Sequence, residues 1–137
     1  MEHLFKYRSH IQEIPQIRKD LEFLNKEWAV PKSEIRQIQL IIEELFSNII
    51  RYAFDDQKEH LIKVRLGKAA EHIEIELIDD GVPFNPLEYE QEQEADPVRS
   101  DSGGMGLTLI RAFCSQINYH RTCEKNHLII TKSLKQK

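Results

Sequence analysis

The spacing of apolar residues changes along the chain from a helical repeat to a strand repeat, and this change constrains the fold more than any other feature. Between residues 14 and 53, apolar side chains recur at steps of three and four, which indicates two amphipathic helices. Between residues 62 and 77 they alternate with polar ones, which indicates strands. Such a chain is expected to bury the helices against one face of a sheet.

The remaining segments complete this outline. Residues 3–9 alternate like a strand, and Pro31 lies just before the second helix, where its missing N–H is tolerated. Residues 67–71 are short enough to join two antiparallel strands. A third helix is expected to open at 103–106 and to carry apolar positions at Leu109, Ile110, Phe113 and Ile117.

Residues 119–134 are predicted to form a closing hairpin that turns near Lys125-Asn126. The expected fold class is α+β, a two-layer sandwich with the helices on one face of a mixed, mostly antiparallel sheet.

Length and charge exclude several classes of protein. With 137 residues, 40% of them apolar, the chain is expected to form a single domain, 1–137. The formal net charge is -4 and the basic residues are scattered, so direct binding to nucleic acid is not expected. No apolar run has the length of a signal peptide core or a membrane span, so a cytoplasmic location is expected. Cys114 and Cys123 are expected to be reduced packing residues.

The first candidate site lies on the second helix, in the segment IIEELFSNIIRYAF. Glu44, Asn48 and Tyr52 are spaced at i, i+4 and i+8 and therefore share one face, with Arg51 beside them. A carboxylate accepts protons, an amide oxygen binds hard cations, and a guanidinium binds phosphate. Taken alone, the same residues also fit a solvated helix face.

The second candidate site is LIDDGVPFNP. Asp79 has the parity of three apolar strand residues, so its carboxylate points toward the helices and needs a partner. An exocyclic adenine amine is a suitable donor, and Gly81 would let the backbone pass close to a flat base. The alternative is an aspartate that caps the Asp80-Gly81 turn.

The third candidate site is SGGMGLTLI, residues 102–110. Three glycines in four positions before a helix leave backbone N–H groups free to surround a phosphate. The segment fits neither a Walker loop nor the dinucleotide fingerprint. In isolation it is also compatible with a flexible hinge.

Taken in order, the three patches resemble the N, G1 and G2 boxes of the GHKL ATPases: Glu-x-x-x-Asn on a helix, Asp-x-Gly after a strand, and Gly-x-Gly before a helix. The PFNP that follows Asp79-Asp80-Gly81, and the closing strand with Asn126, Leu128 and Ile130, resemble the anti-sigma factor serine/threonine kinases within that superfamily. The resemblance spans residues 1–135 and implies the histidine-kinase-like ATPase (Bergerat) fold, with an ATP lid at about 87–102.

The resemblance also implies a role for each matching position. Glu44 would be the catalytic general base, and Asn48 would be the protein ligand of Mg²⁺. Asp79 would bond the adenine amine. The full set expected to contact ATP is Asn48, Arg51, Asp79, Gly81, Gly103, Gly104, Met105, Gly106, Leu107 and Thr131, of which Thr131 is the weakest match.

The function implied by this family is phosphorylation of a serine or threonine on an anti-sigma factor antagonist, together with sequestration of a sigma factor. The cofactors would be ATP and Mg²⁺, and the chain would form a homodimer as its relatives do. Two alternatives stay open. One is an ATP-binding partner-switching protein with little or no kinase activity, and the other is the ATPase domain of a two-component-type histidine kinase system.

Overall fold

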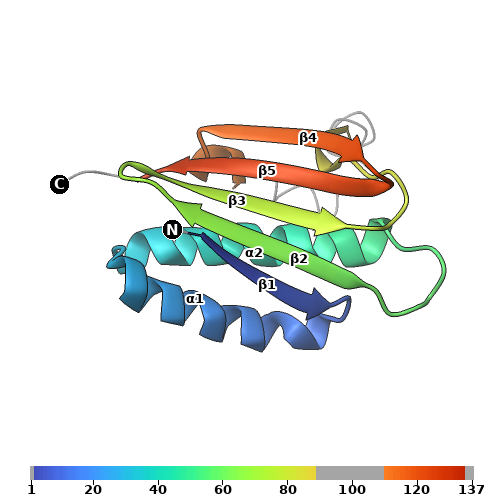
Figure 1. Cartoon of the computed structure of the whole chain (residues 1–137), viewed down its shortest axis with the longest axis horizontal. Coiled ribbons are helices and arrows are strands. Elements are labelled where there is room, and N and C mark those ends of the chain that lie inside the picture. Colours follow the sequence, from blue (N-terminus) through green and yellow to red (C-terminus); the bar gives the residue numbers. More distant parts are fainter. Residues whose placement is uncertain (1, 89–109, 135–137) are drawn as a thin grey trace, which may run out of the picture.

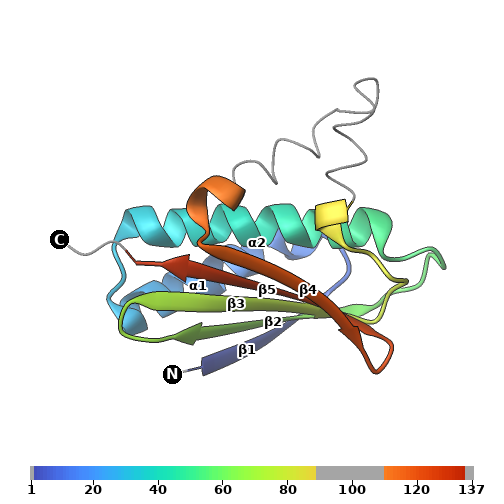
Figure 2. The same ribbon diagram turned by 90° about the horizontal axis from the view of Figure 1, so that it is seen from above.

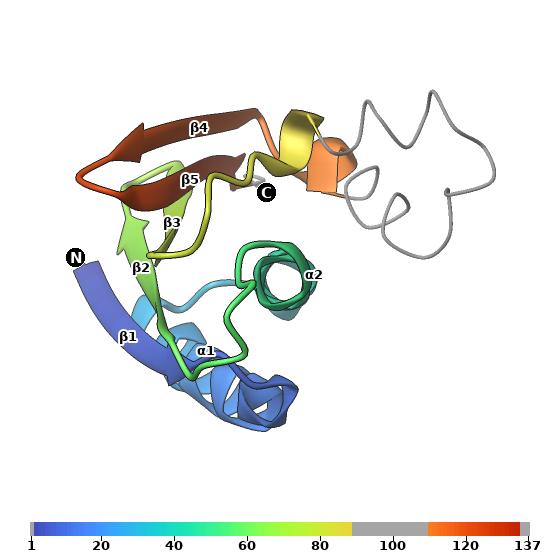
Figure 3. The same ribbon diagram turned by 90° about the vertical axis from the view of Figure 1, so that its right-hand side faces the viewer.

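The computed structural model describes residues 2–88 and 110–134. In chain order the elements are β1 (Glu2–Arg8), a 3-10 turn η1 (Ile11–Glu13), α1 (Ile14–Trp28), α2 (Lys32–Tyr52), β2 (Leu61–Lys68), β3 (His72–Asp79), β4 (Gln116–Thr122) and β5 (Lys125–Ser133). Both helices cover the same face of the sheet, and α2 runs along its middle (Figures 1 and 3).

The sheet has five strands in the order β1-β2-β3-β5-β4. All four neighbouring pairs are antiparallel, so the prediction of a mixed sheet is wrong for the described strands. The reason is that the chain reaches β5 from β4 by a hairpin and not by a crossover. The α+β two-layer arrangement itself is confirmed, and Figure 2 shows the helical layer and the sheet from above.

The core lies between the two layers. Alternate strand residues face the helices, as the burial patterns of β2, β3 and β5 show. The helices contribute the apolar stripes expected from the sequence, including Ile17, Leu21 and Leu24 of α1 and Ile38, Leu45 and Ile49 of α2. Burying such side chains contributes roughly 1.5–3 kcal/mol each. The core therefore fixes α2 and β3, which carry two of the candidate sites.

Three sequence-based expectations about the C-terminal part can be compared with the structure. Ile110 and Phe113 lie in a short helical segment, residues 110–113, but Ile117 lies in β4 opposite Ile130, so its assignment to the helix is wrong. The closing hairpin is present, but it turns at Cys123 and Glu124, two residues earlier than expected. Both residues have positive φ, 54° and 61°, as in the primed turns that suit hairpins.

No helix in the described part of the chain is both long enough and apolar enough to cross a membrane.

Candidate functional site

The central residue of the first candidate site is buried in α2. Asn48 is only 2% exposed, and its Oδ1 has no hydrogen-bond partner among the described residues. An unpaired buried acceptor costs about 1–3 kcal/mol, so an atom of this kind calls for a partner. The structure thus places Asn48 on the side of α2 that is turned away from solvent, and its role as a ligand-binding side chain stays a prediction.

Glu44 lies one turn before Asn48 and is half-buried. Burial raises the pKa of its carboxyl above the ordinary value, and the positive charge of Arg51 opposes that rise. Arg51 itself is exposed in the last turn of α2. The charge of Arg51 therefore reaches Glu44, and the two residues belong to one patch of the helix.

Asp79 ends β3 and is 3% exposed, facing the helices as its parity predicts. Its Oδ1 accepts a hydrogen bond from the backbone N–H of Gly81 at 2.9 Å and another from Asn126 Nδ2 at 2.8 Å. Burial raises the pKa of Asp79, and these two bonds oppose the rise. The bond to Gly81 is the turn-capping contact expected in the alternative interpretation. Both bonds end on Oδ1, so capping the turn does not use Oδ2.

Gly81 is required by a close backbone contact. A Cβ at this position would lie 2.2 Å from the carbonyl oxygen of Ala53, which follows α2 directly. The neighbouring N–H of Val82 donates to the same oxygen at 2.7 Å. The turn after β3 is thus attached to the end of α2, only five residues from Asn48, or about 7.5 Å along the helix axis. The sequence suggested that this glycine leaves room for a flat base, whereas in the structure it leaves room for the carbonyl group of Ala53.

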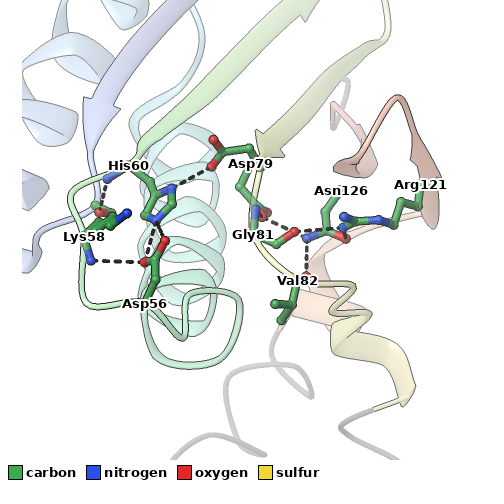
Figure 4. A network of polar contacts seen from close by, with 10 residues as sticks. Asp56, Lys58, His60, Asp79, Gly81, Val82, Arg121 and Asn126 are labelled. Carbon is green, nitrogen blue, oxygen red and sulfur yellow. Dashed lines mark hydrogen bonds and ion pairs between the residues drawn. The ribbon is translucent and has the colours of Figure 1, made fainter.

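Asn126 is a residue of this site that the sequence analysis did not include. It lies at the start of β5 opposite Asp79 and is 3% exposed. Besides Asp79, its side chain contacts Tyr119 and Arg121 of β4 and the turn after β3 (Figure 4). One signal could have found it: Asn126 has the parity of Leu128 and Ile130, so it is a polar residue on an otherwise apolar strand face.

Thr131 is not brought to this site. Its neighbours Ile130 and Lys132 are buried against the helices, so Thr131 points to the other face of the sheet. It also pairs with Glu74, five positions along the ladder from the pair of Asp79 and Asn126. The other expected nucleotide ligands, Gly103, Gly104, Met105, Gly106 and Leu107, lie outside the described residues, as does all of the expected lid except 87 and 88.

His60 lies beside the turn after β3 and contacts two aspartates. His60 Nε2 lies 2.8 Å from Asp56 Oδ1, and Nδ1 lies 2.9 Å from Asp80 Oδ1 (Figure 4). Its ring stacks on Phe54 at a centroid distance of 4.2 Å. The hydrogen bond with Asp56 is the largest cause of a raised pKa at His60; burial opposes it and Asp80 adds to it. These residues and Gly81 line a hollow of about 240 Å³.

Within residues 2–88 and 110–134, no group of three or more His, Cys, Asp or Glu side chains is arranged to hold a metal ion.

The family model described as the histidine kinase-like ATPase domain matches residues 8–132. The chain belongs to this family. The match covers α2, β3 and β5, and so contains Asn48, Asp79 and Asn126. This membership confirms the resemblance to the GHKL ATPases. The family implies that the protein binds ATP.

Two relatives are named as protein kinases. The serine/threonine-protein kinase BtrW of Bordetella bronchiseptica is 26% identical over 95 residues, which are 69% of this chain and 67% of that protein. The serine-protein kinase RsbW of Oceanobacillus iheyensis is 28% identical over 88 residues, 61% of this chain and 56% of that protein.

Solved structures support the fold alone. A blue-light activated histidine kinase of Erythrobacter litoralis EL346 matches with a TM-score of 0.57 and 20% identity, covering 77% of this chain but 32% of the kinase. The histidine kinase AdeS of Acinetobacter baumannii matches with a TM-score of 0.51 and 18% identity, over 99% of this chain and 68% of that protein. The expected histidine-kinase-like ATPase fold is confirmed.

Proposed function

We propose that this protein binds magnesium ATP between α2 and the turn after β3 and transfers the terminal phosphoryl group to a serine or threonine of a partner protein. The partner would be an anti-sigma factor antagonist, and a further surface would bind a sigma factor. The similarity to two proteins named as serine or serine/threonine kinases supports this over a histidine kinase role, because the likeness to histidine kinases is one of fold.

The observation that carries the proposal is the buried Oδ1 of Asn48, which has no hydrogen-bond partner within residues 2–88 and 110–134. A buried amide oxygen without a hydrogen bond is a suitable ligand for a hard cation, which takes oxygen donors and keeps its other positions for phosphate and water. Bound there, Mg²⁺ would offset the negative charge of the phosphates during transfer.

The other residues then have separate tasks. Glu44, whose pKa is raised by burial, would accept the proton of the attacking hydroxyl. Arg51 would contact phosphate oxygens, and the Oδ2 of Asp79 would accept the adenine amine. The backbone of the turn at 103–107 would surround the phosphates. Cation, base and purine contacts would thus come from α2, β3 and the glycine turn.

Nucleotide binding tests the proposal directly. Calorimetry should detect binding of Mg·ATP, and Asn48→Ala should weaken it on the order of tenfold or more, because a buried ligand of the cation is lost. Without magnesium the two proteins should bind ATP about equally. Asn118→Ala, an exposed position on β4, is the matched control. Undetectable binding of ATP by the unaltered protein would refute the proposal.

The phosphorylated product distinguishes the alternatives. Incubation with γ-labelled ATP and a candidate antagonist should give acid-stable and alkali-labile label on serine or threonine. Acid-labile label on histidine would favour the two-component role. ATP binding without any transfer would favour a partner-switching protein without kinase activity. Retention of a sigma factor on the immobilised protein, compared with and without ATP, tests the second surface, and sedimentation tests the expected homodimer.

A further inference from the structure

The amide of Asn126 has an unusually complete set of hydrogen bonds. Its Oδ1 accepts from the Tyr119 hydroxyl at 2.5 Å, from Arg121 Nη1 at 3.0 Å and from the Phe84 N–H at 3.3 Å. Its Nδ2 donates to Asp79 Oδ1 at 2.8 Å and to the Val82 carbonyl at 2.9 Å. Both N–H hydrogens of the amide are thus used.

These partners leave the amide one orientation. Arg121 and the backbone N–H of Phe84 can only donate, so the atom that they face must be the oxygen. The carbonyl of Val82 can only accept, so the atom that it faces must be the NH₂ group. A flipped amide would place acceptor against acceptor at one end and donor against donor at the other. The NH₂ group is therefore held toward Asp79.

This orientation determines how Asp79 can act. Its Oδ1 accepts hydrogen bonds from two donors, the side-chain amide of Asn126 on β5 and the backbone N–H of Gly81 in the turn. Neither bond uses Oδ2, so one carboxylate oxygen is left for a ligand. Both donors also favour the charged form of a carboxyl that burial alone would tend to protonate. A charged carboxylate accepts a hydrogen bond from an amine, and it repels a carbonyl oxygen at the same place.

The same network fixes the turn that carries these groups. Arg121 Nη1 donates to the Gly81 carbonyl at 3.0 Å, and the Val82 carbonyl is held by Asn126. The β4–β5 hairpin thus holds the turn through Arg121 and Asn126 (Figure 4). The Ala53 carbonyl holds the same turn from the end of α2. Displacement of Asn126 would remove one contact that holds the turn and, at the same time, one of the two donors to Asp79 Oδ1.

We propose that Asn126 is a positioning residue that sets the preference for adenine over a 6-oxo purine, because it fixes Oδ1 of Asp79 and leaves Oδ2 to receive the 6-amino group. The inference rests on the proposed ATP site and adds to it the group that confers base specificity. It assigns Arg121 a supporting role, since this side chain holds the amide in the required orientation.

The test compares the affinities for ATP and inosine triphosphate, which carries a carbonyl oxygen in place of the amine. The unaltered protein should prefer ATP on the order of a hundredfold, since a buried polar mismatch is strongly rejected. Asn126→Asp keeps the shape but places a second carboxylate against Asp79. At pH 8 it should weaken ATP binding on the order of tenfold to a hundredfold and reduce the preference over inosine triphosphate in proportion.

The pH profile gives a readout that a merely structural role would not move. Two adjacent carboxyls share a proton as pH falls, and the introduced carboxyl can then donate to Asp79 as the amide did. The ATP preference of Asn126→Asp should therefore recover between pH 8 and pH 5.5. Asn118→Asp adds the same charge at an exposed position on β4 and should keep the preference of the unaltered protein over this range.

A second variant keeps the test informative if Asn126→Asp does not fold. Arg121→Met removes one obligate donor from an exposed residue and should lower the ATP preference in the same direction by a smaller factor. Equal loss of both nucleotides, or an unchanged preference in variants that fold and bind, would overturn the role of Asn126 and leave the ATP site standing. Failure of the unaltered protein to bind ATP would instead refute the proposed function.

Discussion

Glu44 is a single carboxylate whose proposed role in proton transfer can be tested separately from nucleotide binding. Its pKa is raised by burial, which makes it a stronger base than an exposed glutamate. Glu44→Gln keeps the size and removes the basicity. We expect phosphoryl transfer to fall about a hundredfold to ten-thousandfold, with the ATP dissociation constant changed less than about threefold. Single-turnover transfer and calorimetry measure the two quantities separately.

The neighbouring residue provides a matched control. Glu43 carries the same side chain, but it forms a two-point contact with Arg18 of α1, at 2.9 and 3.0 Å, and so lies on another face of α2. Glu43→Gln should leave phosphoryl transfer within about twofold of the unaltered rate, because exposed ion pairs contribute little. Equal losses of transfer and of ATP affinity in Glu44→Gln would contradict the role of a general base.

At the level of residues, the sequence predicted which way side chains face better than it predicted the contacts that they make. Parity placed Asp79 toward the helices, and helical spacing placed Glu44 and Asn48 on one face, because both depend only on local geometry. The need for Gly81 was recognised, but its cause, the Ala53 carbonyl, is a contact between segments far apart in the chain. The same limit applies to Asn126, whose contact with Asp79 joins two strands far apart in the chain, whereas Thr131 was assigned to the site by the family resemblance.

Among the elements, β5 and α2 are joined by a buried ion pair. Lys132 Nζ lies 2.6 Å from Glu34 Oε2, and each side chain is 3% exposed. The contact does not have the geometry of a hydrogen bond at Glu34 Oε2, so attraction between the charges carries it. Lys132→Met leaves a buried carboxylate without a counter-charge, and we expect it to lower the free energy of unfolding by about 3–5 kcal/mol.

The double variant shows whether the pair or the space it fills supports the fold. Lys132→Met combined with Glu34→Leu removes both charges, and it should recover most of the loss in a urea titration, because an apolar pair of similar volume is often as stable. Lys6→Met, on the exposed face of β1, controls for the loss of one lysine. A double variant no more stable than Lys132→Met alone would argue against an unpaired charge as the cause.

The ends of helices and strands were predicted correctly where local sequence signals determine them. They were predicted wrongly where tertiary contacts determine them. Helix α2 begins at Lys32, directly after Pro31, as the proline predicted. The last turn was misplaced because Asn126 looks like a turn residue, whereas its burial beside Asp79 keeps it in β5. Cys123 and Glu124 take the positive φ values instead, and neither residue type signals such a turn. Ile117 fits a helical stripe equally well, and its pairing with Ile130 decides for the strand.

For the whole molecule, the two-layer α+β architecture followed from the change in apolar period, whereas the proposed nucleotide site was inferred from three ordered motifs. What the period could not supply is how the layers are tied together at the site. His60 is one such tie: it connects the start of β2 to Asp56 in the loop after α2 and to Asp80 in the turn after β3. Its backbone also exchanges hydrogen bonds with Ser9 at the end of β1.

This tie should make the stability of the whole fold depend on pH. The pKa of His60 is raised in the folded state, chiefly by Asp56, whereas an unfolded histidine titrates near its ordinary value of about 6.5. Below that value both states are protonated and the stabilisation is complete. As pH rises through the higher folded value, the folded state loses its proton and the stabilisation is lost. The melting temperature should therefore fall as the pH rises above about 6.5.

Comparison with His60→Asn isolates this contribution from the other histidines, which titrate in both proteins. The variant also loses the stacking on Phe54. The difference in melting temperature between the two proteins should be largest at pH 5.5–6, below the ordinary pKa of histidine, and should shrink steadily toward pH 8.5. A difference that stays constant over this range would show that His60 supports the fold by packing and not by its charge.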